Sequence, residues 1–445
     1  MSPWTSLVVV LSAAACTCNR GPDTFVPSPD TGPATEPDLT EELGRCASFD
    51  GQRRPYFGDT HVHTTLSLDA NLQGTRLGPD EAYAFAKGES IAIQPYDTEG
   101  NGLRSLQLDR PLDWAIVSDH AEFLGTVAVC EDPASDAYEE VDCVTLRDNP
   151  DGAFFSLNAR TAREPEDVSY PPLCGDEGQD CIEAGIDVWQ EIQDAAETHY
   201  DRTEDCTFTT FYGYEWTANP GTLNLHRNVV FRSHIVPERP VGYFDAPRVG
   251  ELWALLQGDC LDQPGCDVLT IPHNSNLSSG TMFQTLDDAM PLDPATAATQ
   301  ALMEPLIEIF QHKGDGECLP GSPVADELCG FEKLPYNSLA GTNLGAEGEP
   351  FAKDFVRDLL GEGLRYQASL GVNPYAWGIV ASTDTHLGAP GSASEVDYPG
   401  HGGAGQSNRD ALPEGLVDDA TLNPGGLAVL WAEENSREGL FEAMA

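Results

Sequence analysis

The sequence has few basic residues for its length. Of its 445 residues, 23 are Lys or Arg and 73 are Asp or Glu, which gives a formal net charge of −50. A surface with this charge repels phosphate backbones, so nucleic acid is not expected as a partner. The same field attracts cations. A metal ion or a cationic substrate is therefore electrostatically favoured, whereas an anionic substrate needs local positive charge.

Several motifs are also absent. No C-x-x-C pair occurs among the twelve cysteines, which argues against a zinc site built from thiolates. No G-x-S-x-G or other nucleophile motif is present. The longest apolar run near the N-terminus, residues 7–15 ("LVVVLSAAA"), is too short to span a bilayer. A thiolate zinc site and a serine nucleophile of this type are therefore not expected.

The N-terminus has the pattern of an export signal. The apolar run leads into small residues and Cys16 ("AAAC"), which resembles a lipoprotein cleavage box with Cys16 as the lipidated residue. We assign residues 1–18 to an export or lipoprotein signal and 19–45, rich in Pro, Thr and acidic residues, to a disordered tether. The protein is therefore expected at the periplasm or cell surface, contacting the membrane only through this anchor.

The cysteines fit an oxidising compartment. Eight of them form four pairs that are close in the sequence and predict local disulfides, and Cys46 with Cys206 would close a longer loop. The local pairs are Cys130 with Cys143, Cys174 with Cys181, Cys260 with Cys266, and Cys318 with Cys329.

Short β-branched and aromatic runs predict about seven buried strands. They are residues 114–117, 208–214, 268–271, 306–310, 378–381 and 427–431, with a seventh opening "PYFGDTHVH". Helical patterns at 79–87, 185–200, 248–257 and 352–360 lie between some of them. This alternation predicts a parallel α/β layout, and seven strands suit a barrel.

Polar candidates follow the apolar runs, as expected for a site at the carboxyl ends of strands. The longest linking stretches, 121–205, 275–304, 319–350 and 387–425, follow the same ends. We expect them to be long loops on the active face that shape a substrate pocket.

Six of the ten histidines stand at predicted strand ends or beside carboxylates, and imidazole with carboxylate suits zinc, manganese or iron. In "THVH", strand alternation puts His61 and His63 on one side of the chain, and in "STDTH" it does the same for Asp384 and His386. Each motif alone is weak, but their recurrence predicts a metal centre. The other members are Asp119 and His120 in "VSDH", Glu215 in "GYEW", His226 in "LNLHRN" and His273 in "IPHN".

The order H-x-H, D-H, Glu, further His and D-x-H resembles the PHP (polymerase and histidinol phosphatase) superfamily. The segments "YFGDTHVHT", "DWAIVSDHAEFLG", "HRNVVFR", "IFQHKGDGEC" and "GGLAVLWAEEN" resemble the bacterial family called domain of unknown function 3604, itself PHP-like. The resemblance covers residues 50 to 445 within a domain of 46–445. It implies a distorted (β/α)7 barrel with long loop insertions, and a further segment beyond Ala445.

The resemblance also implies two to three divalent metal ions, such as zinc, manganese or iron. The first would be held by His61, His63, Glu215 and Asp384. The second would be held by Glu215, His226 and His273, with Glu215 shared. The third would be held by Asp69, His120 and His386.

Other polar residues beside these motifs are candidates for acid–base or substrate-binding roles. An equally open alternative is that they orient ligands, cap loops or form salt bridges within the acidic surroundings. The acid–base candidates are Asp119, Glu122, Glu308 and His312, and the anion-binding candidates are Arg227, Arg232 and Lys313, with Asn274 and Asn276 as hydrogen-bond partners.

We therefore expect an exported metal-dependent hydrolase, a phosphoesterase acting on a small-molecule ester with hydroxide generated at the metal centre. One alternative keeps the metals but cleaves another ester, an amide or a sulfate. A second alternative is a non-catalytic surface protein that binds ligands through its metals. The sequence leaves the substrate, the metal identity and the oligomeric state open.

Overall fold

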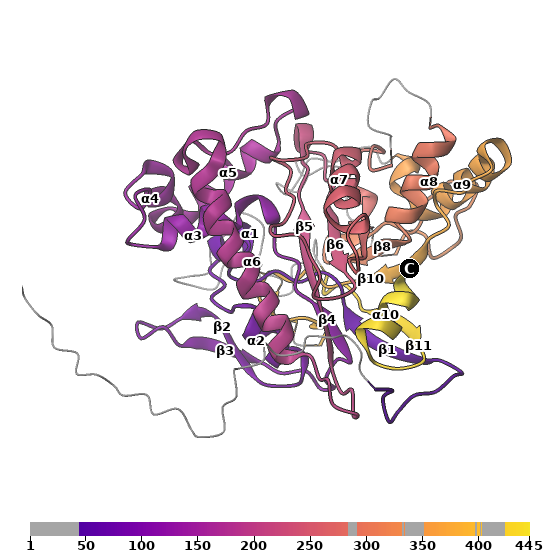
Figure 1. Ribbon diagram of the computed structural model, residues 1–445, viewed down its shortest axis with the longest axis horizontal. Coiled ribbons are helices and arrows are strands. Elements are labelled where there is room, and N and C mark those ends of the chain that lie inside the picture. The colour runs from indigo at the N-terminus through magenta and orange to yellow at the C-terminus, as the bar shows by residue number, and fades with distance from the viewer. Residues whose placement is uncertain are drawn as a thin grey trace, which may run out of the picture. The chain divides into compact units, whose positions relative to one another are not determined.

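The computed structural model describes residues 44–283, 292–331, 333, 351–396, 398–400, 402 and 423–445, which form mixed α/β structure (Figure 1). The proposed signal, Cys16 and most of the proposed tether lie outside the described residues. In the described part of the chain, no helix is both long enough and apolar enough to cross a membrane.

The strands are short and most of them are buried. They are β1 (Arg54–Asp59), β2 (Ile91–Tyr96), β3 (Gly102–Leu106), β4 (Trp114–Ile116), β5 (Thr209–Trp216), β6 (Arg227–Phe231), β7 (Val268–Pro272), β8 (Leu306–Gln311), β9 (Gly314–Asp315), β10 (Gly378–Ala381) and β11 (Ala428–Ala432).

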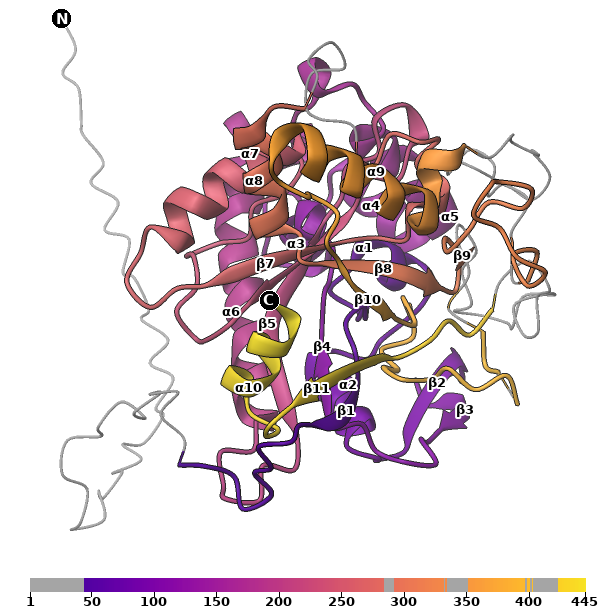
Figure 2. The ribbon, with the colours of Figure 1, turned by 90° about the vertical axis from the view of Figure 1, so that its right-hand side faces the viewer.

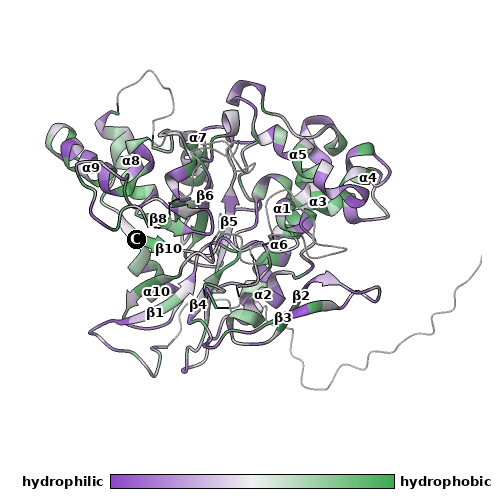
Figure 3. Ribbon diagram, turned by 180° about the vertical axis from the view of Figure 1, so that it is seen from behind, coloured by the Kyte–Doolittle hydropathy of each residue, from purple (hydrophilic) through white to green (hydrophobic). Residues whose placement is uncertain are grey.

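The helices lie mainly between strands. They are α1 (Leu68–Leu72), α2 (Pro79–Ala86), α3 (Leu124–Glu131), α4 (Val141–Asp148), α5 (Pro150–Thr161), α6 (Gln179–His199), α7 (Val249–Leu256), α8 (Pro294–Met303), α9 (Val356–Leu370) and α10 (Arg437–Met444). Several, such as α5 and α9, alternate hydrophilic and hydrophobic residues along the ribbon, as helices with one buried face do (Figure 3).

The main sheet has six strands in the order β11-β1-β4-β5-β6-β7, and it curls as a partial barrel (Figure 2). Strands β1, β4 and β5 are parallel, whereas β11 is antiparallel to β1, and β6 is antiparallel to both β5 and β7. A second sheet has the order β10-β8-β9, and β2 with β3 forms a separate hairpin.

The prediction of a (β/α)7 barrel is therefore wrong, although the mixed α/β class holds. The connection from β5 to β6, residues 217–226, contains only a short 3-10 turn, so β6 returns antiparallel instead of crossing over through a helix. Strands β8 and β10 pair with each other, and no ladder between described residues joins them to β7 or β11. The barrel is consequently open.

All seven predicted apolar runs lie in strands, and all four helical patterns lie in helices, the last of them in a 3-10 turn followed by α9. The expectation of long loops is wrong for residues 121–205, because this stretch contains α3, α4, α5 and α6. The parts of 275–304, 319–350 and 387–425 that fall on 284–291, 332, 334–350, 397, 401 and 403–422 lie outside the described residues.

The curled sheet buries apolar residues on both faces. On its concave inner face, Trp114, Phe211 and Val230 pack with residues of β7, β8, β10 and β11. On its outer face, Tyr212 and Tyr214 pack against α2, α6 and α7. Because side chains alternate along a strand, Phe211 on the inner face places Glu215, four residues later, on the same face at the carboxyl end of β5.

Helix α10 closes one side of the inner core. Its buried residues Leu440, Phe441 and Met444 belong to the same cluster as Trp114 and Phe211, and the helix lies beside β11 (Figure 2). Arg437, at its first position, is buried and its guanidinium bonds Glu197 of α6 (2.6 Å) and the Thr210 carbonyl (2.6 Å). These bonds join the start of α10 to α6 and to β5, a central strand of the main sheet.

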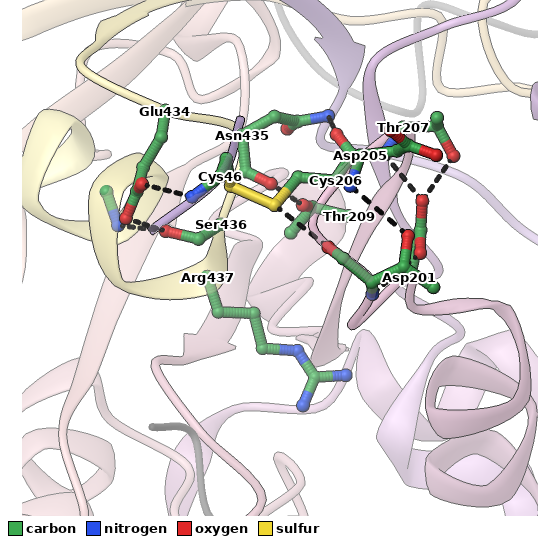
Figure 4. Close-up of a disulfide and its surroundings, with 12 residues drawn as sticks. Cys46, Asp201, Asp205, Cys206, Thr207, Thr209, Glu434, Asn435, Ser436 and Arg437 are labelled. Atoms are coloured by element: carbon green, nitrogen blue, oxygen red, sulfur yellow. Dashed lines mark hydrogen bonds between the residues drawn. A yellow bond between two sulfur atoms is a disulfide. The ribbon is translucent and has the colours of Figure 1, made fainter. Parts of the chain in front are cut away.

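The described residues form five disulfides, and they are the five predicted pairs. The prediction of an oxidising, extracellular environment is supported by them. The Cys46–Cys206 bond lies beside the start of α10 (Figure 4). There the Cys46 amide donates to Glu434 (3.0 Å), and the Asn435 side chain donates to the Cys206 carbonyl (3.1 Å).

One buried carboxyl group gives a pH-dependent prediction. Asp354 accepts hydrogen bonds from the Ser278 hydroxyl (2.8 Å) and from the amides of Gly280 (2.5 Å) and Phe351 (3.1 Å). Burial outweighs these bonds and raises the pKa of Asp354 from 3.8 to about 6. Because the folded protein then holds this proton more tightly than the unfolded chain does, ionisation of Asp354 opposes folding as the pH rises through this range.

We expect Asp354→Asn to remove this pH-dependent penalty. Between pH 4 and pH 7, the unfolding free energy of the variant should shift relative to wild type by up to about 3 kcal/mol in favour of the variant. Urea unfolding of both proteins at the two pH values measures this shift. A difference that is the same at both pH values would show that Asp354 titrates normally in the folded protein.

Candidate metal centre

The candidate ligands lie where strands of both sheets end. His61 and His63 follow β1, His120 follows β4, and Asp384 follows β10. Backbone bridges between Val62 and Thr385 and between His120 and Glu215 hold these segments beside one another. His226 directly precedes β6, and because β6 is antiparallel to β5, this start meets the carboxyl end of β5. The strand directions therefore gather the motifs at one end of the inner face.

Three members of the first predicted ligand set converge in the structure, and the fourth, Glu215, borders them. The His61 Nε2 atom lies 3.3 Å from Glu215 Oε2 and 3.4 Å from Asp384 Oδ1. The His63 Nε2 atom lies 3.4 Å and 3.1 Å from the same two oxygens. All four side chains are buried. The ligand atoms of His61, His63 and Asp384 thus lie within 4.8 Å of one another, and Glu215 Oε2 borders this group beside the two histidines.

Three of these atoms make no hydrogen bond within the described part of the chain: His61 Nε2, Glu215 Oε2 and Asp384 Oδ1. Buried polar atoms are almost always hydrogen-bonded, because an unsatisfied one loses its hydration without compensation. Nitrogen and oxygen atoms that converge in this way are the donor set that zinc, manganese and iron bind. The residues present therefore fit the implied metal.

The third predicted set also comes together. Asp69 Oδ2 lies 2.9 Å from His120 Nε2 and 2.8 Å from His386 Nε2. The ring of His63 stacks on that of His386 at 4.7 Å and lies 4.5 Å from that of His120, so it borders both groups. Ligand atoms of His63, Asp69, His120 and His386 lie within 4.8 Å of one another.

The second predicted set is only partly assembled. Glu215 Oε1 lies 3.0 Å from His226 Nδ1, and Glu215 Oε2 lies 3.0 Å from His120 Nδ1, so the structure groups Glu215 and His226 with His120. His273 instead has its Nε2 atom 2.7 Å from the amide of Gln311 and 3.6 Å from Asp384 Oδ2. Its Nδ1 atom contacts the carbonyl of Asn274 at 2.8 Å.

The pKa shifts of most of these groups favour the deprotonated forms that bind metal ions. Burial lowers the pKa of His63 to about 4 and that of His226 to about 3, so both rings are neutral. Burial alone would raise the pKa of Glu215 and Asp384, but neighbouring cationic groups, His61 foremost, hold both pKa values well below the usual range. Metal ligands must be deprotonated, and these four groups are.

His61 behaves differently. Burial alone would lower its pKa, but the carboxylates of Asp384, Glu215 and Glu308 outweigh burial and raise the pKa well above the usual value. A metal ion that binds Nε2 must therefore displace a proton from this ring, so metal affinity should fall at acidic pH.

Two of the remaining candidates adjoin Asp384. His312 Nε2 lies 3.2 Å from Asp384 Oδ2, and the Lys313 ammonium contacts the same oxygen. The two oxygens of Asp384 are thus divided, with Oδ1 toward His61 and His63 and Oδ2 toward His312 and Lys313. Lys313 is the basic candidate that the structure brings to the cluster.

The other basic candidates have different partners. Arg227 is buried and its Nε atom lies 3.0 Å from Glu304, which is fully buried. Arg232 pairs on the surface with Asp267 (3.2 Å) and Glu438. These contacts match the salt-bridge alternative, so the structure supplies a structural role for both arginines.

Asp119, Glu122 and the two asparagines hold loops in place. Asp119 accepts from the amide (2.6 Å) and hydroxyl (2.7 Å) of Thr64. Glu122 accepts from the amides of Thr217 (2.8 Å) and Tyr243 (2.6 Å). The side-chain amides of Asn274 and Asn276 donate to carbonyls of Gly314 and Lys313.

Gln311 is a neighbour of the cluster that the sequence interpretation missed. Its amide lies 2.6 Å from Asp384 Oδ2 as well as 2.7 Å from His273. Its place at the end of an apolar run, directly before His312, is the sequence feature that points to it. Glutamine is a rare metal ligand, so this position alone does not predict a site residue.

Glu308 positions His61. Its Oε2 atom lies 2.8 Å from His61 Nδ1, and its Oε1 atom accepts from the Asn274 amide at 2.8 Å. A carboxylate on Nδ1 fixes the ring orientation and leaves Nε2 directed at the other ligands. We expect Glu308→Gln to weaken metal binding about 10- to 100-fold, measured by competition with a chromophoric chelator.

The matched control for Glu308 is Glu317→Gln, because Glu317 pairs with Arg357 on the surface. This control should leave metal affinity unchanged. Equal affinity of Glu308→Gln and wild type would show that Glu308 does not position His61.

A family model described as protein of unknown function (DUF3604) matches residues 50–445. The chain belongs to this family. The match spans every candidate ligand of this DUF3604 protein, from His61 to His386. No curated protein and no solved structure matches it. The function of the DUF3604 domain must therefore be argued from the site itself.

Proposed function

We propose that this protein is an exported metal-dependent hydrolase, and specifically a phosphoesterase of PHP-like chemistry. The observation that carries the proposal is the convergence of buried His61, His63 and Asp384, bordered by Glu215, with polar atoms that have no hydrogen-bond partner among the described residues. A folded protein tolerates such a group best when a cation binds it. The resemblance of the motif order to the PHP superfamily supports the same conclusion.

The proposed centre holds two to three divalent ions, with zinc, manganese and iron as candidates. The first ion would be held by His61, His63, Glu215 and Asp384, and another by Asp69, His120 and His386. Glu215 and His226, with His120 or His273, would supply the remaining position. When bound, such ions lower the pKa of water and stabilise charge that develops on the substrate oxygen.

The chain's own residues would bind and orient the substrate. Lys313 contributes positive charge beside Asp384 in a protein of net charge −50, as an anionic ester requires. His312, on the same carboxylate oxygen, is placed to hold or release a proton at the leaving group. Glu308 and Asp119 hold His61 and the loop after it in position.

Export is proposed from the N-terminal pattern and is consistent with the five disulfides. An anchor at Cys16 would keep the domain at the membrane surface. Mass spectrometry of the mature N-terminus tests both points, because a lipidated chain would begin at Cys16.

The proposed function is tested by metal analysis and a substrate panel. The purified protein should contain at least two ions per chain and should hydrolyse a phosphate ester after reconstitution with manganese or zinc. Sulfate and carboxylate esters and amides in the same panel test the alternative hydrolases. Metal binding without turnover of any substrate would instead favour a ligand-binding protein, and one ion or fewer would contradict the multinuclear centre.

A further inference from the structure

Gln311, the last residue of β8, lies between two candidate ligands of the metal centre. Its side chain is buried. The Gln311 Nε2 atom lies 2.6 Å from Asp384 Oδ2 and 2.7 Å from His273 Nε2. The Gln311 Oε1 atom lies 2.5 Å from the backbone nitrogen of Lys313. Both ends of the side-chain amide are therefore in contact with polar partners, and two of these partners are candidate ligands.

The partners of Gln311 allow only one orientation of its amide group. The backbone N–H of Lys313 can only donate, so it faces the carbonyl oxygen Oε1. The ionised carboxylate of Asp384 can only accept, so it faces the amide nitrogen Nε2. An amide turned by half a rotation would set donor against donor at Lys313 and acceptor against acceptor at Asp384. The hydrogen-bond network thus assigns the nitrogen of Gln311 to the side of His273.

This orientation determines where His273 carries its proton. The His273 Nδ1 atom lies 2.8 Å from the Asn274 carbonyl, which can only accept, so Nδ1 is protonated. The His273 Nε2 atom faces the side-chain nitrogens of Gln311 at 2.7 Å and of Asn224 at 3.4 Å, which can only donate. The Nε2 atom is therefore unprotonated and accepts a hydrogen bond from Gln311.

We propose that Gln311 is a positioning residue of the candidate metal centre, which joins His273 to the Asp384 carboxylate and fixes the orientation of that carboxylate. The terminal torsion of an aspartate side chain is broad, so the carboxylate needs a partner to hold it. A bond from Gln311 to Oδ2 keeps Oδ1 directed at His61 and His63. Hydrogen-bond partners of this kind orient metal ligands in proteins.

Gln311 differs in charge from the other groups at Asp384 Oδ2. His312 and Lys313 also contact this oxygen, and the ammonium of Lys313 neutralises part of its charge. The amide of Gln311 is uncharged, so it orients the carboxylate and leaves the negative charge that a metal ion needs. We therefore expect the effect of Gln311 to appear in the geometry and affinity of the site.

The proposal rests on the metal centre of the proposed function, but its first test needs neither metal nor turnover. Nitrogen NMR of the full-length protein, labelled in its histidine rings and stripped of metal by a chelator, reports the protonation of each ring nitrogen. His273→Gln removes the resonances of this ring and so assigns them. At neutral pH, His273 of the wild-type protein should have a protonated Nδ1 atom and an unprotonated Nε2 atom. A protonated Nε2 atom overturns the proposal.

Gln311→Met tests the contact itself, because methionine keeps the length of the side chain but cannot donate a hydrogen bond. The Nε2 resonance of His273 should move downfield as its hydrogen bond is lost. The metal affinity, measured by competition with a chromophoric chelator, should fall about 10- to 100-fold. An unchanged resonance or an unchanged affinity overturns the proposal. A wild-type protein that binds no ion contradicts the proposed function, whereas the NMR comparison still decides whether Gln311 holds His273.

Gln300→Met is the matched control. Gln300 is also a buried glutamine whose amide donates to a carboxylate, that of Glu304 at 3.0 Å, but it lies on α8 and contacts no candidate ligand. This variant should keep the His273 resonance and the metal affinity of the wild type, whatever it does to stability. Circular dichroism establishes that both variants are folded. An equal loss of affinity in the two variants would reveal a general loss of structure and would overturn the positioning role of Gln311.

Discussion

Replacement of Glu215 by Gln should reduce ester hydrolysis about 10³-fold or more and lower the metal content by at least one ion per chain. Glu215 adjoins four of the candidate ligands: its Oε2 atom adjoins His61, His63 and His120, and its Oε1 atom adjoins His226. An amide could not supply the negative charge that the proposed ions would require. Under the proposed function, this loss would correspond to several kcal/mol of transition-state stabilisation supplied by the metals.

Elemental analysis and kcat/KM on the same preparations measure both effects. Glu317→Gln, which changes a surface carboxylate paired with Arg357, should retain full metal content and activity. Circular dichroism and urea unfolding establish that each variant is folded. Full metal content in folded Glu215→Gln would contradict the assignment of Glu215 as a shared ligand.

Replacement of Arg227 by Met should destabilise the protein by about 3–5 kcal/mol. Arg227 and Glu304 are both buried, and the Arg227 guanidinium also donates to the Met282 carbonyl at 2.7 Å. Removal of the guanidinium leaves the Glu304 carboxylate buried without its charged partner. Urea unfolding gives the change in the free energy of unfolding.

Two further variants separate this structural role from a catalytic one. Arg227→Met combined with Glu304→Gln should recover part of the loss, because the buried charge is gone. Arg232→Met, at a surface ion pair, should change stability by about 1 kcal/mol or less. If Arg227→Met were as stable as wild type and lost only turnover, the catalytic role suggested by its place after His226 would be supported instead.

The strands could be predicted from the sequence, but the way in which they pair could not. Runs such as residues 114–117 and 268–271 are apolar on both sides, so each had to be a buried strand. Whether β6 runs parallel or antiparallel to β5 depends on the path of residues 217–226, which carries no periodic pattern. Closure of a barrel depends on pairing between strands far apart in the sequence, and that is a tertiary property.

The arrangement of the candidate ligands could likewise be predicted only in part. Alternation along an extended segment placed His61 with His63, and the structure brings both to Asp384. The position of His273 could not be foreseen, because it depends on a loop contact to the Asn274 carbonyl and on Gln311. The approach of His312 to Asp384 follows from the pairing of β8 with β10, which no local pattern specifies.

The Cys46–Cys206 bond has a mechanical consequence. Cys46 is eight residues before the first residue of β1, Arg54, and its partner lies three residues before the first residue of β5, Thr209. A pulling force that enters the chain ahead of Cys46 divides at the Cys46 α-carbon between the backbone that leads to β1 and the disulfide that leads to the segment before β5. Strand β1, which His61 and His63 follow, therefore carries only part of the load.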